Sequence, residues 1–369
     1  MDSVQITIIG GGVIGLSVAV ELSKHHGDIV LVERHGKPGQ ETSSRSSEVI
    51  HSGLYYKKDS LKAKLCVEGA RLLYEYCERN SVPHLKTGKL IVSVVENQRQ
   101  DLEELFKRGI ENGVKNLRLI DSAEVAKIEP RIKAAAAIHS PCTGIIDSHT
   151  LMGRLSTEAA ANGVVFSFNT EINFIEKTPE GYVLGVKDSD YRFFSSIVVN
   201  ASGLSSDRVA SLAGIDTDEA GYRLSYCKGS YFSYSDEKKS PPCKMLVYPL
   251  PERQLKGLGI HATVDMVGKI RFGPDTEDID EIDYRVDAGK GQAFFESVDK
   301  YIKNLRREAF AADMAGVRPK VKGGDFVIIH EHQRGREGFI NLIGIESPGL
   351  TACISIARMV SAMVREYIN

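Results

Sequence analysis

Apolar runs and a glycine-rich break alternate at the start of the chain, and they predict a strand, a turn, a helix and a second strand. Gln5–Ile9 is an apolar run of strand length, and Asp28–Glu33 is a second one that ends on an acid. Between them, Leu16–Ser23 continues a helix that begins in the glycine stretch. The N-terminal region therefore predicts the first βαβ unit of an α/β fold.

Periodicity predicts further helices and strands along the chain, without an internal repeat or a low-complexity linker. The predicted helices are 61–77, 99–112, 147–162, 289–310 and 347–364. The predicted strands are 89–95, 164–168, 171–177, 182–187, 197–201, 223–234, 244–250, 257–264, 326–330 and 339–343. The strand 197–201 runs into a small-residue turn, Ser202-Gly203-Leu204, where we expect a second cofactor contact. A chain of 369 residues can bury a large core and form two domains interleaved in sequence.

Gly10, Gly12 and Gly15 form a G-x-G-x-x-G motif in this first unit. In such a motif the first glycine permits a tight turn, the second lets the backbone approach a pyrophosphate, and the third lets the helix pack on the strand. The exposed N–H groups at the start of the helix then face the phosphates. Glu33 follows Gly15 by 18 residues (33 − 15) and can accept hydrogen bonds from ribose hydroxyls. A glycine turn in an ordinary α/β sheet would leave Glu33 unexplained, so we expect a bound dinucleotide.

Composition and charge narrow the class of protein. The net charge of −2 gives no general attraction to nucleic acid or to an anionic membrane, so any charge recognition is local. Six cysteines show neither C-x-x-C nor zinc-ligand spacing, which predicts buried thiols, no metal site and a reducing compartment. No run of 18 uninterrupted apolar residues occurs, so we expect a cytoplasmic protein, with a peripheral membrane contact left open.

Three further segments carry residues suited to a flavin site, each with a plain structural alternative. The hydroxyl-rich stretch Thr42–Tyr56 includes His51 and can wrap a pyrophosphate and ribityl chain, or it can be a polar surface loop. Gly344–Thr351 can place a helix N-terminus, beginning near Pro348, at the pyrimidine edge of a flavin, or it can be an ordinary helix cap. His261 lies on an apolar strand, where a hydrogen-bonded core histidine is the commoner outcome.

Taken together, these motifs resemble the flavin oxidoreductases of the D-amino-acid-oxidase superfamily, and within it the L-2-hydroxyglutarate dehydrogenase/oxidase group. The matching segments run in order along the whole chain. They are Gly10–Glu33, Thr42–Tyr56, Lys62–Gly69, Thr87–Val92, Val199–Leu204, Tyr248–Pro251, Gly257–Thr263, Gly273-Pro274, Gly316–Pro319 and Gly344–Thr351.

Two turns depart from the pattern of that group. Many of its members continue G-P-N-A where this chain has Gly273-Pro274-Asp275-Thr276. Many end with N-A-P-S-P-A where this chain has Gly344–Gly349, with Glu346 in the middle. The chain therefore resembles a side branch of the group, and its reaction class is better determined than its substrate.

The resemblance implies a glutathione-reductase-type FAD-binding Rossmann domain with an interleaved antiparallel-sheet substrate domain, an α/β fold that is α+β overall. The predicted FAD-binding domain comprises 1–84, 142–222 and 316–369, and the substrate domain comprises 85–141 and 223–315. FAD is expected to bind non-covalently, although His51 lies where some relatives attach flavin to histidine. The predicted cofactor-binding residues are Gly10, Gly12, Val13, Ile14, Gly15, Glu33, Arg34, Thr42, Ser43, Ser44, Ser46, His51, Ala201, Gly203, Gly344, Ser347, Pro348, Gly349, Leu350 and Thr351.

The resemblance also implies oxidation of an L-2-hydroxy acid, best matched by L-2-hydroxyglutarate, to a 2-oxo acid. The flavin accepts the hydride while a base takes the hydroxyl proton. His261 is the preferred base and His51 the second choice. Lys89 and Arg318 are the predicted anchors for the substrate carboxylates, with Tyr248 as a neutral donor.

Two other activities stay open at this point. One is an amine, amino-acid or glycerol-3-phosphate oxidising flavoenzyme of the same superfamily, and the other is a non-catalytic flavin-binding subunit. No second glycine motif follows a later strand and no cysteine cluster suggests an iron–sulfur centre. The electrons must therefore leave to an external acceptor, and we favour a quinone or a protein over oxygen.

Overall fold

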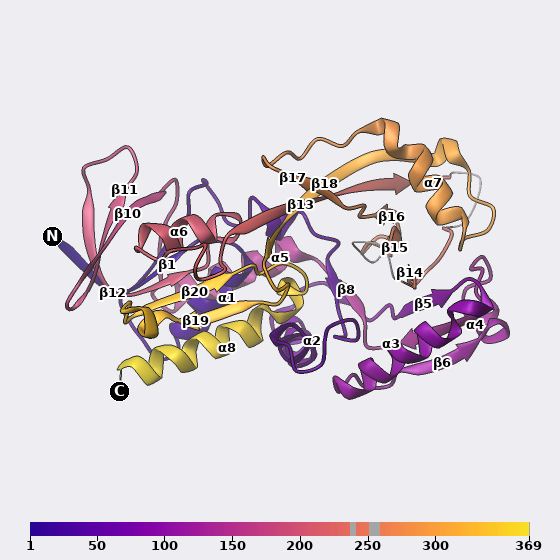
Figure 1. The fold of residues 1–369 in the computed structure, drawn as a ribbon, viewed down its shortest axis with the longest axis horizontal. Coiled ribbons are helices and arrows are strands. Elements are labelled where there is room, and N and C mark those ends of the chain that lie inside the picture. The colour runs from indigo at the N-terminus through magenta and orange to yellow at the C-terminus, as the bar shows by residue number, and fades with distance from the viewer. Residues whose placement is uncertain (237–240, 251–258, 369) are drawn as a thin grey trace.

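The computed structural model describes residues 1–236, 241–250 and 259–368, and the strands in these ranges form three sheets. The two large sheets lie in separate halves of an elongated molecule, with β1 and α8 on the left of Figure 1 and α3, α4 and α7 on the right. The helices of the described residues are α1 (Val13–Leu22), α2 (Leu61–Asn80), α3 (Arg99–Glu111), α4 (Ser122–Ile128), α5 (Ser148–Ala161), α6 (Ser206–Leu212), α7 (Gly291–Asp299) and α8 (Gly349–Ile368).

The first sheet has eight strands and carries the N-terminal βαβ unit. In spatial order they are β10 (Ile172–Thr178), β11 (Gly181–Val186), β12 (Arg192–Asn200), β1 (Asp2–Ile9), β2 (Ile29–Val32) and β9 (Val165–Ser167), with β20 (Phe339–Ile343) beside β12 and β19 (Val327–His330) beside β20. The strands β1, β2, β9, β12 and β20 are parallel where they pair with one another.

This sheet is covered on both faces, which explains its apolar strands. In β12, Ile197 and Val199 pack into the core that contains buried residues of α1, α5 and α8, whereas Val198 packs on the opposite face with residues of α6. Successive side chains of a strand point to opposite faces, so a strand that is buried on both faces is apolar at most successive positions.

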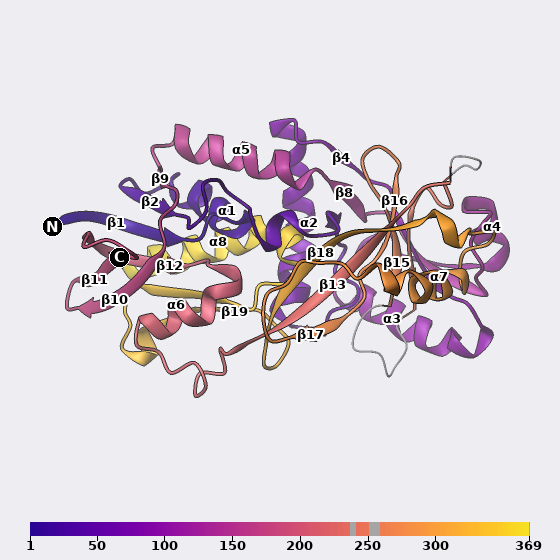
Figure 2. The same ribbon diagram turned by 90° about the horizontal axis from the view of Figure 1, so that it is seen from above.

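The second sheet has nine strands and a mostly antiparallel topology. In spatial order they are β17 (Glu277–Ile279), β13 (Leu224–Tyr234), β16 (Ile270–Gly273), β15 (His261–Val264), β14 (Leu246–Pro249), β5 (Lys89–Ser93), β7 (Ala136–Ser140) and β6 (Arg118–Asp121), with β18 (Phe310–Val321) beside β13. The long pair β13 and β18 reaches from α6 towards α7 (Figure 2). The third sheet is small and consists, in spatial order, of β3 (Val49–Ile50), β8 (Gly144–Ile146) and β4 (His84–Leu85).

The predicted helix 289–310 is wrong beyond Asp299, where α7 ends. The following backbone pairs with residues 131–133 instead of continuing the helix. Lys303 N donates to Arg131 O, Lys133 N donates to Tyr301 O, and Ile302 forms a bridge with Ile132. Because these groups find partners in another part of the chain, the helical periodicity of the segment is overridden.

The strand β18 was not predicted, and it begins at Phe310 and pairs with β13 as far as Val321. The predicted domain boundary between residues 315 and 316 therefore falls inside a continuous strand, while the division into two domains stays a prediction. Similarly, α8 begins at Gly349, two residues after the predicted start, and Pro348 O accepts the bond from Ala352 N. Residues 257 and 258 of the predicted strand 257–264 lie outside the described residues.

Candidate active site

A pocket crosses between the two large sheets, and its walls come from both. Ile9, Val32 and Leu342 line it from the eight-stranded sheet, and Gly229 and Val317 line it from the nine-stranded sheet. At the carboxyl ends of parallel strands, α/β proteins commonly bind nucleotides, and β1 and β2 present those ends here.

The glycine turn at one end of the pocket has the backbone that a phosphate-binding turn requires. Gly10 has φ of +111°, and a Cβ there would lie 2.5 Å from Ala201 O. A Cβ on Gly15 would collide with Gly10 O, so α1 approaches β1 only because this position has no side chain. Val13 N, in the first turn of α1, is held by the Ser43 hydroxyl at 3.0 Å. These residues fit the diphosphate of a dinucleotide.

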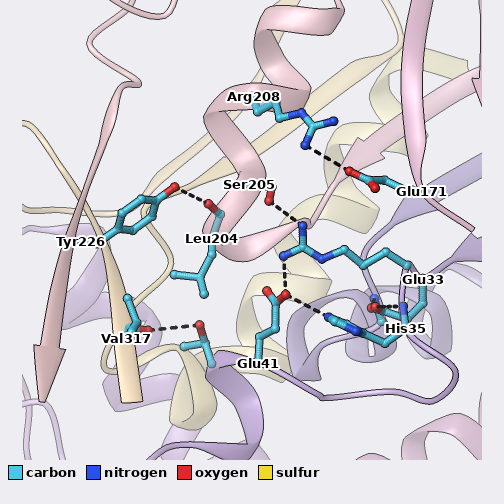
Figure 3. Close-up of polar contacts among 12 residues, drawn as sticks. Glu33, His35, Glu41, Glu171, Leu204, Ser205, Arg208, Tyr226 and Val317 are labelled. Atoms are coloured by element: carbon cyan, nitrogen blue, oxygen red, sulfur yellow. Dashed lines mark hydrogen bonds and ion pairs between the residues drawn. The ribbon is translucent and has the colours of Figure 1, made fainter. Parts of the chain in front are cut away.

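The pocket beyond this turn is lined by charged groups that pair with one another. Glu33 accepts hydrogen bonds from Gly11 N at 2.7 Å and His35 N at 2.8 Å, which leaves lone pairs of this pocket-lining carboxylate for ribose hydroxyls. Arg34 pairs with Glu41 and donates to the Ser205 hydroxyl at 3.1 Å. Figure 3 shows this network, together with His35 beside Glu41 and Arg208 beside Glu171. This part of the pocket, which we call the adenosine end, is lined by residues 33–35, 41, 171, 205 and 208.

The hydroxyl-rich segment crosses the middle of the pocket. Thr42 and Ser43 lie in a short 3-10 turn, where Thr42 Oγ1 donates to Val317 O at 3.2 Å. Ser46 also lines the pocket, whereas the Ser44 hydroxyl donates to Gly39 O and does not face it. The structure therefore brings the predicted hydroxyls together with the glycine turn, except for that of Ser44.

The other end of the pocket, which we call the ring end, is lined by residues 51, 231, 248, 261, 318, 346 and 347. There, His51 is held by the turn before α8. His51 N donates to Thr351 Oγ1 at 2.9 Å, and His51 Nε2 lies 3.4 Å from Ser347 Oγ. His51 Nδ1 is buried and has no hydrogen-bond partner among the described residues. Burial, followed by the charges of Lys89 and Arg318, lowers the pKa of His51 to about 3, so the imidazole is neutral. An orphaned buried nitrogen is expected where a ligand supplies the missing partner.

His261 faces the same end from the second sheet, and the strand register explains its position. Val247 pairs with Ala262, so the next antiparallel pair is Tyr248 with His261. The two rings stack with centroids 3.7 Å apart and planes 13° apart. His261 Nδ1 lies 3.0 Å from Gly259 O. A carbonyl only accepts, so Nδ1 carries the proton and Nε2 keeps a free lone pair.

Charge around His261 favours the neutral imidazole. Burial, followed by the charges of Arg318 and Lys89, holds the pKa of His261 well below its usual value. Arg318 lines the pocket and has no carboxylate within ion-pair distance among the described residues. Its guanidinium hydrogen-bonds to the phenol of Tyr231, which also contacts Ser47. The ring end therefore combines a neutral imidazole with a guanidinium that has no carboxylate within ion-pair distance among the described residues.

Lys89 lies outside the pocket wall, so its side chain is not placed to contact a substrate directly. Its side chain is almost completely buried, and Nζ lies 4.5 Å from the Tyr248 ring centroid and 4.9 Å from that of Tyr55. Lys89 is not among the pocket-lining residues. Burial lowers its pKa to about 7, against a smaller opposing effect from Cys66. The structure therefore places Lys89 behind Tyr248, one layer from the pocket.

Most of the predicted cofactor-binding residues line the pocket, and four do not. Those that line the pocket are Gly10, Gly12, Val13, Ile14, Glu33, Arg34, Thr42, Ser43, Ser46, His51, Ala201, Gly203, Ser347, Pro348, Gly349 and Leu350. Those that do not line it are Gly15, Ser44, Gly344 and Thr351. The Thr351 hydroxyl accepts from His51 N and donates to Val49 O at 3.3 Å, so it supports the loop that carries His51.

Sequence reasoning missed several lining residues. Tyr231 lies on β13 without any motif around it, and Glu171 and Arg208 come from segments far apart in the chain. No local signal marks these positions, because only the folding of the sheets brings them to the pocket. Among the described residues, no cluster of three or more His, Cys, Asp or Glu side chains could hold a metal ion. No helix of the described chain has the length and apolar character needed to cross a membrane.

Comparisons with known proteins show the family of the chain. The chain is 36% identical to "L-2-hydroxyglutarate dehydrogenase, mitochondrial" of Arabidopsis thaliana over 409 aligned residues, which cover 98% of this chain and 83% of the relative. It is 34% identical to the enzyme of the same name from Pongo abelii over 289 residues, covering 74% of this chain and 67% of the relative. These relatives confirm the predicted resemblance.

A solved structure of another protein has the same fold as this chain. The dithionite-reduced L-α-glycerophosphate oxidase from Mycoplasma pneumoniae with FAD bound superposes with a TM-score of 0.90 at 27% identity, covering 99% of this chain and 95% of that one. The family profile described as "FAD dependent oxidoreductase" matches residues 5–363. Both findings confirm the predicted fold class, FAD as the cofactor and an oxidoreductase activity. The chain therefore belongs to the family of FAD dependent oxidoreductases, DAO.

Proposed function

We propose that this protein is an FAD-dependent dehydrogenase that oxidises L-2-hydroxyglutarate to 2-oxoglutarate. The relatives that match most of the chain carry that activity in their names. The observation that carries the proposal is the ring end itself. His261, with a free Nε2, and Arg318, with no carboxylate partner among the described residues, both line the pocket.

In the proposed reaction, the hydride goes to FAD and the proton goes to a residue of the protein. When bound, FAD supplies the acceptor for the hydride that leaves C2 of the substrate. His261 Nε2 takes the proton of the C2 hydroxyl, so the C–H and O–H bonds both break and the carbonyl forms. The hydrogen bond to Gly259 O and the stack on Tyr248 fix the ring plane, which keeps Nε2 directed while the proton moves.

His51 is the alternative base, and its contacts favour an orienting role. Its Nε2 is already close to Ser347 Oγ, and its backbone is tied to Thr351. The Ser347 hydroxyl can donate to Nε2, which then leaves Nδ1 protonated as a donor to a ligand. We therefore assign His51 as a donor that orients substrate or cofactor and His261 as the base.

A dicarboxylate needs two anchors, because a buried carboxylate without a partner is costly. Arg318 holds the first carboxylate, with the phenols of Tyr231 and Tyr248 beside it in the pocket wall. Lys89 contributes to the second through its charge, from behind the Tyr248 ring. This arrangement retains the predicted substrate residues Lys89, Tyr248 and Arg318 and adds Tyr231.

A substrate panel tests the activity. Purified protein is mixed anaerobically with L-2-hydroxyglutarate, L-lactate, L-malate, glycerol 3-phosphate, glycine and proline, and flavin reduction is followed by absorbance. L-2-Hydroxyglutarate is expected to reduce the flavin fastest. Glycerol 3-phosphate is included because the matched Mycoplasma structure is a glycerophosphate oxidase, and preference for it would replace this proposal. If no compound bleaches the flavin, the protein is a non-catalytic flavoprotein.

The electron acceptor and compartment are also proposals. We favour a quinone or a protein acceptor over oxygen, which is tested by mixing substrate-reduced protein with air-saturated buffer and, separately, with a soluble quinone. Stoichiometric hydrogen peroxide within a turnover would identify an oxidase instead. The six free cysteines support a reducing compartment such as the cytoplasm, although both relatives are named as mitochondrial. Cell fractionation decides between these compartments and detects any peripheral membrane contact.

A further inference from the structure

A nearly buried ion pair joins α2 to the turn before α8. Lys62 Nζ lies 2.7 Å from Glu346 Oε1, and the side chains are only 10% and 14% exposed. Glu346 lines the cofactor pocket, whereas Lys62 does not. The pair thus connects a carboxylate in the pocket wall to a cation outside it.

Lys62 is held by contacts with residues 325 and 326 as well as by its ion pair with Glu346. The Asp325 carboxylate accepts from Leu61 N at 2.8 Å and from Lys62 N at 2.9 Å, which holds the first turn of α2. Nζ also lies 5.4 Å from the centroid of the Phe326 ring. Lysine is flexible in general, and these contacts restrict where its charge can lie.

Glu346 differs from three other carboxylates that line the pocket. Glu33 is held by backbone amides, Glu41 by Arg34 and Glu171 by Arg208, and these lie at the adenosine end. Glu346 lies at the ring end, next to Ser347, whose hydroxyl contacts His51. Glu346 is therefore a carboxylate in the wall of the ring end that forms its ion pair with a cation outside the pocket.

We propose that the Lys62–Glu346 pair sets the reduction potential of the bound flavin. A carboxylate in the wall of the ring end opposes the addition of electrons to that ring, because burial strengthens the Coulomb interaction. The Lys62 ammonium offsets this effect at 2.7 Å. The two residues act on the flavin through their charges and take part in no proton or hydride transfer. This inference rests on the FAD cofactor and is independent of the substrate.

Reduction potentials of three variants test the pair. Lys62→Met, Glu346→Gln and the double variant are loaded with FAD and titrated anaerobically with dithionite against a reference dye, which requires no substrate. Lys62→Met is expected to lower the potential and Glu346→Gln to raise it, each by about a tenfold change in the ratio of reduced to oxidised flavin, or about 30 mV for a two-electron couple. The double variant is expected to return close to the parent value.

Arg71→Met is the matched control, because Arg71 pairs with Glu75 on the exposed side of the same helix at 2.6 Å. It is expected to leave the potential unchanged. Equal potentials for the parent, Lys62→Met and Glu346→Gln, or shifts of the same sign in both single variants, would overturn the proposal. If Lys62→Met does not fold, Glu346→Gln still decides the question, because glutamine can keep the hydrogen bond to Lys62 while removing the charge.

Discussion

The two ends of the pocket differ in how the cations in their walls are paired. At the adenosine end, Arg34, Glu41, Glu171 and Arg208 pair with one another or with neighbouring protein charges. At the ring end, Arg318 has no carboxylate partner among the described residues, and His51 Nδ1 is buried without a hydrogen bond. Paired groups hold a shape before any ligand arrives, whereas unpaired ones gain a partner only from a ligand. On the proposed function, the adenosine end binds the cofactor and the ring end carries out the chemistry.

The largest expected effect comes from removing the base at the ring end. His261→Ala should slow flavin reduction by L-2-hydroxyglutarate about 10²–10⁴-fold, the usual contribution of a positioned general base. Single-turnover absorbance measures the rate, and the thermal unfolding midpoint controls for misfolding. His51→Ala is the comparison variant and should lose less. A greater loss for His51→Ala would exchange the roles of the two histidines.

Arg318→Ala should produce the next largest effect, because it removes the unpaired cation of the ring end. The loss in kcat/KM for a dicarboxylate is expected to be about 2–5 kcal/mol. L-2-Hydroxyglutarate is compared with glycerol 3-phosphate in the same variant. FAD content should not change, and an unchanged kcat/KM for the dicarboxylate would contradict the assignment of Arg318 as its anchor.

A smaller effect is expected at the adenosine end. Arg34→Ala breaks the contacts to Glu41 and Ser205 that shape this end before FAD binds. FAD affinity should fall about tenfold, since preorganisation of this kind is worth about 1–1.5 kcal/mol. Fluorescence titration of the apoprotein measures the affinity. At saturating FAD the rate of flavin reduction should match that of the parent protein, and a slower rate would show that the two ends are not separable.

The smallest expected effect concerns pH. Because burial and nearby cations hold the pKa of His261 well below its usual value, the base is neutral near pH 7 and loses activity only as pH falls through that lowered pKa. Lys89→Met removes one of these cations, so the pKa of His261 should rise and the acidic limb of the kcat/KM profile should move to higher pH. A profile of flavin reduction against pH measures this. An unmoved limb would mean that the charge of Lys89 does not reach His261.

A second pH effect follows from Lys89 itself. Its pKa is about 7 in the folded protein and close to 10.5 when unfolded. Between these values the unfolded state binds more protons, so the contribution of this group to stability rises as pH increases from 7 towards 10.5. Lys89→Met should abolish that contribution, which denaturant unfolding at several pH values would detect.

Much of the fold and cofactor site followed from local sequence. The spacing of Gly10, Gly12, Gly15 and Glu33 predicts a turn, a helix and an acid from local sequence alone. The segment 289–310 shows the limit of such reasoning. Its helical periodicity is real as far as Asp299, and beyond that point the pairing of Ile302 with Ile132 decides the structure. The strand β18 escaped prediction for the same reason, since its main partner β13 lies far away in the sequence.

The sequence by itself determined that this protein binds a dinucleotide, carries a hydroxyl-rich loop with His51 and ends in a helix near the cofactor. Each of these depends on short-range backbone geometry. Only the tertiary structure decided that Tyr248 stacks on His261, that Lys89 lies behind them and that Glu346 meets Lys62. These contacts join strands and helices separated by tens to hundreds of residues, and their register is set by the packing of whole sheets. Burial and charge at the ring end are therefore properties of the assembled fold, and no local pattern encodes them.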